Sequence, residues 1–227
     1  MRIGIYGGSF DPIHNGHVKV AMDAIHDLEL AKLIVIPAAV SPFKVESAPK
    51  NNYDRLLLVR AAFNGVEKVE VDDREIKKGG VSFAIDTVRE IKSEHPDSEI
   101  YFVIGEDSLS GLERWKDYDE LKKLCSFRAF KRTSESSSEV RRRLENGESI
   151  RDLVPEVVEL MLKYPVSYNP DAALVGNVLK GLERKLGYCP CRLPKTPEFF
   201  CPCDEFKSQL KDNSFKGLCH CRLYCKI

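Results

Sequence analysis

Two histidines near the N-terminus are the first residues whose type and spacing point to chemistry. His14 and His17 lie three residues apart, around the predicted start of a helix, and Gly7-Gly8 precede them at the end of a short apolar strand. The start of a helix carries unpaired N–H groups and a positive partial charge, which together bind phosphate. Glycine lets a ligand approach the backbone closely, and two imidazoles can donate hydrogen bonds to charge that develops on a phosphate. The string GGSFDPIHNGH over residues 7–17 therefore predicts phosphate chemistry rather than a buried structural histidine.

The cysteines form a second group with chemical potential. Seven of the eight lie between Cys189 and Cys225, and only Cys125 lies elsewhere. Six of the seven form three C-x-C pairs, separated by nine and by fifteen residues. Structural zinc sites usually use cysteines roughly two to four residues apart, whereas a [4Fe–4S] cluster uses about four thiolates. The count favours a cluster plus a redox-active pair of thiols, with a structural zinc tail as the alternative.

The elements that must position the histidines alternate along the first 131 residues. The apolar pattern predicts strands over residues 2–6, 32–37, 66–71, 99–104 and 126–130. Between them it predicts helices over residues 18–28, 53–63, 82–91 and 115–124. Such alternation is typical of βαβ units and a parallel sheet. Ligands of these sheets bind beyond the carboxyl ends of the strands, which is where the glycines and histidines lie.

The C-terminal part of the chain follows a different pattern. Helices are expected over residues 138–145 and 155–164, followed by a linker over residues 165–170. Asn169 and Pro170 are typical of a helix N-cap and first helical residue, so a helix should run from there to Leu186 and end at Gly187. We predict two domains, residues 1–165 and 166–227, the second with a net charge of +4.

The composition excludes several classes of protein. Hydrophobic residues make up 43% of the 227, and the formal charge is zero, so neither wholesale disorder nor general polyanion binding is expected. The longest apolar stretch is far too short to cross a bilayer, and the start MRIGIYGGSF lacks the features of a signal peptide. We therefore expect a cytoplasmic protein with no membrane and no nucleic-acid partner.

Several segments of residues 1–165 resemble the nicotinate-nucleotide adenylyltransferases, a family of nucleotidyltransferases with an H-x-G-H signature. Beyond the N-terminal motif, the segments that match in order are PAAVSPFK at 37–44, GVSFAIDT at 80–87, FVIGEDSL at 102–109, LERW at 112–115 and SSSEVR at 136–141. The resemblance implies a Rossmann-like α/β fold and transfer of the adenylyl group of ATP to nicotinate mononucleotide, releasing pyrophosphate. Mg²⁺ would arrive bound to the phosphates.

The resemblance also assigns residues to the two substrates. Those implied to face ATP are Gly7, Gly8, Ser9, Phe10, His14, His17, Lys44, Gly105, Asp107, Ser137 and Arg141. Those implied to face the pyridine ring and its carboxylate are Ser82, Phe83 and Trp115. Among these, the two histidines would contact the phosphates and the transition state. Taken singly, Trp115 could equally be a core aromatic, Asp107 a helix cap and Arg141 part of a solvated face.

The chain departs from the family pattern after Arg132. The family normally has a few dozen residues there, including another strand, whereas only Thr133, Ser134 and Glu135 remain before Ser136. The shortened connection removes one wall near the nucleotide and puts a charged residue at a usually apolar position. The alternative to adenylyl transfer is therefore a first domain that only binds nucleotide.

The tail resembles the catalytic subunit of ferredoxin:thioredoxin reductase, through the order CPC, CPC, CHC over about residues 168–227. The resemblance implies a small, mainly α domain in which a [4Fe–4S] cluster is held by Cys189, Cys201, Cys203 and Cys219. Cys191 and Cys221 would form the active disulfide, with His220 transferring protons, while Cys225 is additional. The implied partners are a thioredoxin-like disulfide protein and an acidic one-electron donor such as ferredoxin, which the net charge of +4 would attract.

Overall fold

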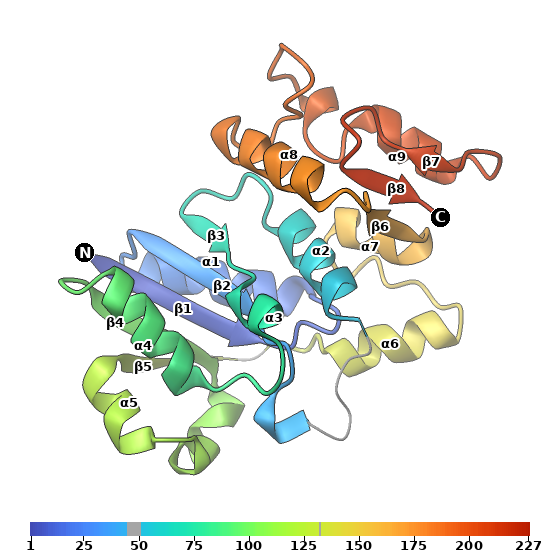
Figure 1. Cartoon of the computed structure of the whole chain (residues 1–227). Coiled ribbons are helices and arrows are strands. Elements are labelled where there is room, and N and C mark those ends of the chain that lie inside the picture. The colour runs from blue at the N-terminus through green and yellow to red at the C-terminus, as the bar shows by residue number, and fades with distance from the viewer. Residues whose placement is uncertain (45–50, 132) are drawn as a thin grey trace.

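A five-stranded parallel sheet forms the centre of the N-terminal part of the molecule (Figure 1). The computed structural model describes residues 1–44, 51–131 and 133–227. The sheet order is β3-β2-β1-β4-β5, and every neighbouring pair is parallel. Its strands are β1 Arg2–Gly8, β2 Lys32–Pro37, β3 Val69–Val71, β4 Glu99–Gly105 and β5 Ser126–Phe130. The predicted α/β Rossmann-like fold is confirmed.

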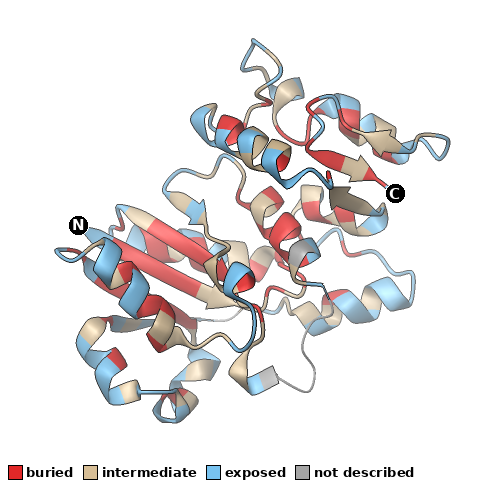
Figure 2. Ribbon diagram, in the orientation of Figure 1, coloured by how far each residue is buried: buried red, intermediate tan, exposed pale blue. Residues whose placement is uncertain are grey.

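Helices cover both faces of this sheet because its strands are apolar on both sides. On one face, Leu33 and Val35 pack with side chains from α1 Asn15–Asp27 and α2 Asn52–Ala62. On the other, Ile34 and Ile36 pack with side chains from α4 Ala84–Glu94 and α5 Tyr118–Leu124. Because side chains alternate along β2, this strand contributes apolar side chains to two separate layers. The buried central strands between exposed helix surfaces are visible in Figure 2.

Some boundaries differ from the predicted ones for local reasons. The strand expected from residue 66 begins only at Val69, because Lys68 has a positive φ of 64° and the preceding residues form a turn. The helix expected from residue 115 begins at Tyr118, because Asp117 lies in the left-handed region. The remaining short elements of this part are η1 Pro42–Lys44, α3 Arg74–Lys78 and η2 Glu106–Arg114.

The C-terminal part is mainly helical but also contains a small sheet. Its helices are α6 Ser137–Glu145, α7 Glu156–Lys163, α8 Ala172–Arg184, η3 Pro197–Phe199 and α9 Asp204–Lys211. Its strands are β6 Val166–Tyr168, β7 Gly217–Leu218 and β8 Tyr224–Lys226, and they form an antiparallel sheet of order β6-β8-β7. The predicted linker over residues 165–170 thus contains a strand. The prediction was wrong because pairing with β8, far away in sequence, decides its structure.

The start of α8 also differs from the prediction. Asp171, not Asn169, is the N-cap, and its side chain accepts a hydrogen bond from the Leu174 N–H at 3.0 Å. Asn169 instead donates to the Arg222 carbonyl at 2.9 Å and accepts from the Asp171 N–H. Its side chain therefore joins the beginning of α8 to the last cysteines.

Helices α2 and α7 lie between the parallel sheet and the cysteine-rich tail (Figure 1). Just beyond the end of α2, the Asn64 side chain donates to the carbonyls of Gly187, at 3.0 Å, and Cys201, at 2.8 Å. One buried apolar cluster runs from the side chains of α1 and α2 into the tail and includes five of its cysteines. The tail is therefore packed onto the sheet domain, while the division at residue 165 stays a prediction.

Candidate functional site

A cavity of about 240 Å³ opens at the carboxyl ends of β1 and β4. Chain order reverses between these two neighbours, since β2 lies on one side of β1 and β4 on the other. Such a switch point is where open parallel sheets bind their ligands. Eight of the predicted site residues line this cavity: Gly7, Gly8, Phe10, His14, His17, Gly105, Asp107 and Trp115.

The two histidines stand together at the start of α1. Their ring centroids are 3.7 Å apart, and the backbone N–H of His14 donates to Nδ1 of His17 at 3.2 Å. Because Nδ1 of His17 accepts this bond, its other ring nitrogen is the one that carries a proton. The ring of Phe10 packs edge-on against His17, with centroids 5.0 Å apart, and fixes its orientation further.

The loop after β1 is held by a residue that sequence reasoning missed. Arg55 of α2 is 3% exposed, and its guanidinium donates to the carbonyls of Ser9, Ala38 and Ala39 and to the Asn52 side chain. Burial lowers the pKa of Arg55, and the charge of Asp11 opposes this shift. The loop needs such support because Phe10 has a positive φ of 46°, a strained conformation for a bulky residue.

Trp115 lines the cavity on the side of β4. Its ring makes edge-to-face contacts with Phe102, at 5.5 Å, and Phe127, at 5.9 Å. Both aromatic partners come from strands, so the indole is held rigidly while part of it remains exposed to the cavity. A fixed aromatic face of this kind suits stacking with a flat ligand ring.

Both residues predicted to lie near the pyridine carboxylate are outside this cavity. Ser82 and Phe83 line a smaller, separate pocket beside Glu75. The Ser82 hydroxyl accepts a hydrogen bond from the Ala39 N–H at 3.0 Å, so this segment supports the loop after β2. Burial raises the pKa of Glu75, which accepts a hydrogen bond from Thr87. The role of Ser82 and Phe83 toward a pyridine ring stays a prediction.

The remaining predicted ATP residues surround the loop after β1. The Ser9 carbonyl accepts from Arg55. The Ser137 hydroxyl donates to the Pro12 carbonyl at 2.9 Å. Arg141 donates to the Asp11 carbonyl and lies 3.5 Å from the Asp11 carboxylate. Lys44 ends η1, and its side chain lies outside the part of the chain that the structure describes.

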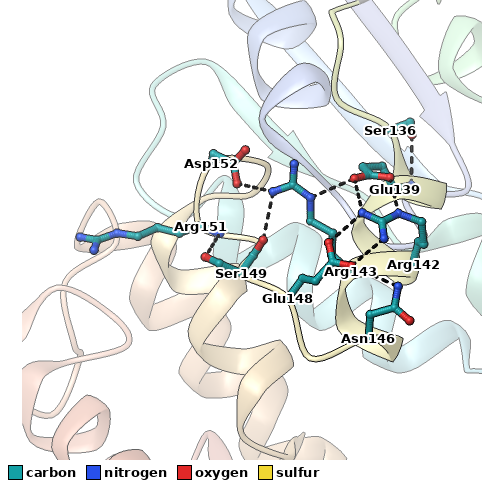
Figure 3. A network of polar contacts seen from close by, with 9 residues as sticks. All are labelled: Ser136, Glu139, Arg142, Arg143, Asn146, Glu148, Ser149, Arg151 and Asp152. Carbon is teal, nitrogen blue, oxygen red and sulfur yellow. Dashed lines mark hydrogen bonds and ion pairs between the residues drawn. The ribbon is translucent and has the colours of Figure 1, made fainter.

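A network of charges joins α6 to the segment over residues 148–152 that follows it (Figure 3). Glu139 accepts from Arg142 and Arg143, and Arg143 also pairs with Asp152 at 2.7 Å. Next to Asp152, the Leu153 carbonyl accepts from the Asn15 N–H at 2.8 Å. The network therefore stabilises the segment that bonds to the start of α1, although the residues of the network do not line the cavity.

Glu139 makes the network sensitive to acid. Hydrogen bonds from Arg142 and then Arg143 lower its pKa to about 2 from an ordinary 4.5. A carboxylate with a depressed pKa stabilises the fold above its unfolded value and loses this effect as the pH falls toward the folded value. We expect the urea midpoint to fall between pH 4.5 and 2, and to fall less in Glu139→Gln. Glu67→Gln, at an exposed site, should follow the wild type; parallel curves for all three proteins would contradict this.

The cysteines of the tail gather in the interior, with one exception. Cys189, Cys201, Cys203, Cys219 and Cys221 are buried, Cys225 is half-buried and Cys191 is exposed. Sγ of Cys219 lies 3.5 Å from Sγ of Cys221, which also forms a hydrogen bond with Cys189. These bonds from Cys221 lower the pKa of Cys189 to about 6 and that of Cys219 to about 7.

The donor type and burial of these thiols suit a metal centre, but their positions do not complete one. Among residues 1–44, 51–131 and 133–227, no three Cys, His, Asp or Glu side chains are placed so that they could hold a metal ion. All eight cysteines are free thiols. The predicted redox partner Cys221 contacts the predicted ligands Cys189 and Cys219, and His220 is exposed. Cys125 is isolated, and burial raises the pKa of its thiol to about 12.

A doubly wound parallel sheet with paired imidazoles at its switch point defines the class of Rossmann-like nucleotide-binding proteins. The cytidylyltransferase-like family matches residues 5–170. The chain belongs to this family and, within it, to the nicotinate-nucleotide adenylyltransferases. None of the helices in the described part is long and apolar enough to cross a membrane.

Similar proteins carry consistent names. A "Probable nicotinate-nucleotide adenylyltransferase" of Gemmatimonas aurantiaca is 37% identical over 70% of this chain and 88% of its own length. A protein of Shouchella clausii with the same name is 36% identical over 71% of this chain and 94% of its own length. The structure of Plasmodium falciparum nicotinic acid mononucleotide adenylyltransferase complexed with NaAD aligns with a TM-score of 0.58 at 22% identity. The alignment covers 71% of this chain and 95% of the Plasmodium chain, and it shows that the two proteins have similar folds.

Proposed function

We propose that the chain transfers the adenylyl group of ATP to nicotinate mononucleotide, forming the dinucleotide and pyrophosphate in NAD synthesis. The observation that carries the proposal is the meeting of His14 and His17 in a cavity at the switch point of the sheet. The names of relatives that share more than a third of their residues with this chain support the choice of substrate.

The proposed reaction is an in-line displacement at the α-phosphorus of ATP. The phosphate of the mononucleotide forms a new P–O bond, while the bond from the α-phosphorus to the bridging oxygen breaks and pyrophosphate leaves. ATP would enter with Mg²⁺ on its phosphates, so the metal is part of the substrate. The imidazoles would donate to the charge on the phosphoryl oxygens, a contribution that grows in the transition state.

The direct test measures product formation. The protein is incubated with ATP, Mg²⁺ and nicotinate mononucleotide, and pyrophosphate and dinucleotide are quantified. Equal amounts of the two products, both absent when the mononucleotide is omitted, would support the proposal. Nicotinamide mononucleotide in a parallel reaction distinguishes a preference for the acid from one for the amide. Binding of ATP in equilibrium dialysis without any pyrophosphate would instead support the binding-only alternative.

We also propose a second function, in which the tail reduces disulfides. In this proposal a [4Fe–4S] cluster is held by Cys189, Cys201, Cys203 and Cys219. It is favoured by the burial of these four residues, one of which, Cys189, forms a hydrogen bond with the exposed Cys191. The cluster, when bound, would supply electrons one at a time from a donor such as ferredoxin. Cys191 would attack the disulfide of a thioredoxin-like protein, and Cys221 would displace the second thiol. The target then carries two thiols and the chain a Cys191–Cys221 disulfide, which two electrons and two protons restore.

Metal analysis of protein purified without oxygen tests this second function. About four irons and four sulfides per chain, with brown absorbance, would support it. Cys203→Ser should lose iron, whereas Cys125→Ser, far from the tail, should keep it. Stoichiometric zinc without sulfide would establish the structural zinc alternative, and protein free of both metals would contradict the cluster.

A further inference from the structure

The short connection from β5 to α6 puts a carboxylate into the cavity. Thr133 and Glu135 line it together with His14 and His17. The Thr133 hydroxyl sits directly above Gly16, where an added Cβ would lie 2.2 Å from its oxygen. The described residues of this connection, 131 and 133–136, contain no strand. Where the family pattern has a longer wall, this chain therefore has a hydroxyl and a carboxylate against the H-x-G-H motif.

Glu135 is held in place from its own segment. The Thr133 side chain forms a hydrogen bond to its carboxylate. This bond, then a backbone hydrogen bond of Glu135 and then the charge of His14 lower the pKa of Glu135. The Oε2 atom is buried and has no hydrogen-bond partner within the described ranges. An ionised carboxylate with an unused, water-excluded oxygen is strongly favoured to interact with a nearby positive charge.

The imidazole of His14 is the group that can supply this charge. It is 4% exposed, so its burial disfavours a positive charge unless an anion lies nearby. Asp107 lines the cavity from the end of β4, and Asp152, in the segment over residues 148–152, pairs with Arg143 at 2.7 Å. Arg141 is engaged with Asp11. Within the described residues, Glu135 is thus the carboxylate placed to offset the cost of burying a charged His14.

We propose that Glu135 is a positioning residue that holds His14 as an imidazolium, ready to donate to the phosphates bound in the cavity. This inference rests on the proposed adenylyl transfer. The opposing effect is that a negative charge near the phosphates would repel ATP. The two effects predict opposite outcomes for Glu135→Gln, which keeps the shape of the side chain and removes its charge.

Titration of the histidines by NMR tests the pairing without reference to activity. The chain has five histidines, and His14→Asn identifies the signals of interest. In Glu135→Gln we expect the titration midpoint of His14 to fall by about one pH unit, because a carboxylate in the same cavity is lost. Glu145→Gln, an exposed neighbour at the end of α6, should leave it unchanged. An unchanged midpoint in Glu135→Gln would overturn the proposal.

Kinetics test the consequence for the reaction. A midpoint lower by one unit reduces the charged fraction of His14 about tenfold at pH values well above both midpoints. We therefore expect kcat to fall about tenfold at pH 8 and to recover at lower pH. A rise in kcat/KM for ATP in Glu135→Gln would overturn the proposal in favour of repulsion. If the wild type makes no dinucleotide, the proposed function fails while the NMR result still decides the pairing.

Discussion

Replacing either His14 or His17 with asparagine is expected to lower kcat for adenylyl transfer by about 10²- to 10³-fold, the usual effect of removing one donor to a developing oxyanion. Both imidazoles line the cavity, and their rings lie 3.7 Å apart. They therefore address the same phosphate region. Because catalysis depends on interactions that strengthen in the transition state, kcat should fall more than the affinity for ATP.

Asparagine separates the chemical role of each histidine from its structural role. His14 is the N-cap of α1, a position that asparagine also favours, and at position 17 the amide oxygen can accept the hydrogen bond now made to Nδ1. The helix start should therefore survive in both variants. His26→Asn, on the same helix but at an exposed site, is the control and should keep full activity. Steady-state rates at saturating substrates within threefold of wild type for His14→Asn or His17→Asn would refute the assignment.

The parallel sheet could be predicted from the sequence because its information is local. Each buried strand is a short apolar run followed by a turn signal, as in residues 32–37, and each helix shows its own apolar period. Strand alternation with helices then leaves few topologies. Predicted boundaries were wrong where a single residue adopts a left-handed conformation, as at Lys68 and Asp117, because the residue types at these positions do not indicate that conformation.

Contacts between distant segments could not be predicted in the same way. The strand at residues 166–168 exists because it pairs with β8 almost sixty residues later, and its own sequence resembles a linker. Arg55 carries no sequence signal either, because an arginine on a helix is usually exposed. In the sequence, Glu135 stands out only as a charge at a usually apolar position, and its place beside His14 in the cavity depends on how the shortened connection folds.

Arg55→Ala is expected to have the largest effect on stability, because it removes a buried guanidinium that serves two loops at once. The side chain is 3% exposed and donates to backbone carbonyls after both β1 and β2. Each buried acceptor left without a donor costs about 1–3 kcal/mol. With the Ser9 and Ala38 carbonyls both affected, we expect a loss of about 3 kcal/mol and a Tm lower by about 6–12 °C.

The same change should weaken nucleotide binding, since the loop over residues 7–10 loses the contact that supports the positive φ of Phe10. Arg55→Lys keeps the charge but has a compact ammonium with three donors in place of the planar guanidinium with five, so it should fall between wild type and Arg55→Ala. Arg184→Ala, where an exposed arginine donates to the Lys180 carbonyl of its own helix, is the matched control and should melt like the wild type. Thermal unfolding followed by circular dichroism, with and without saturating ATP, measures both effects. A Tm for Arg55→Ala within 1 °C of the control would show that the two loops hold themselves in place without α2.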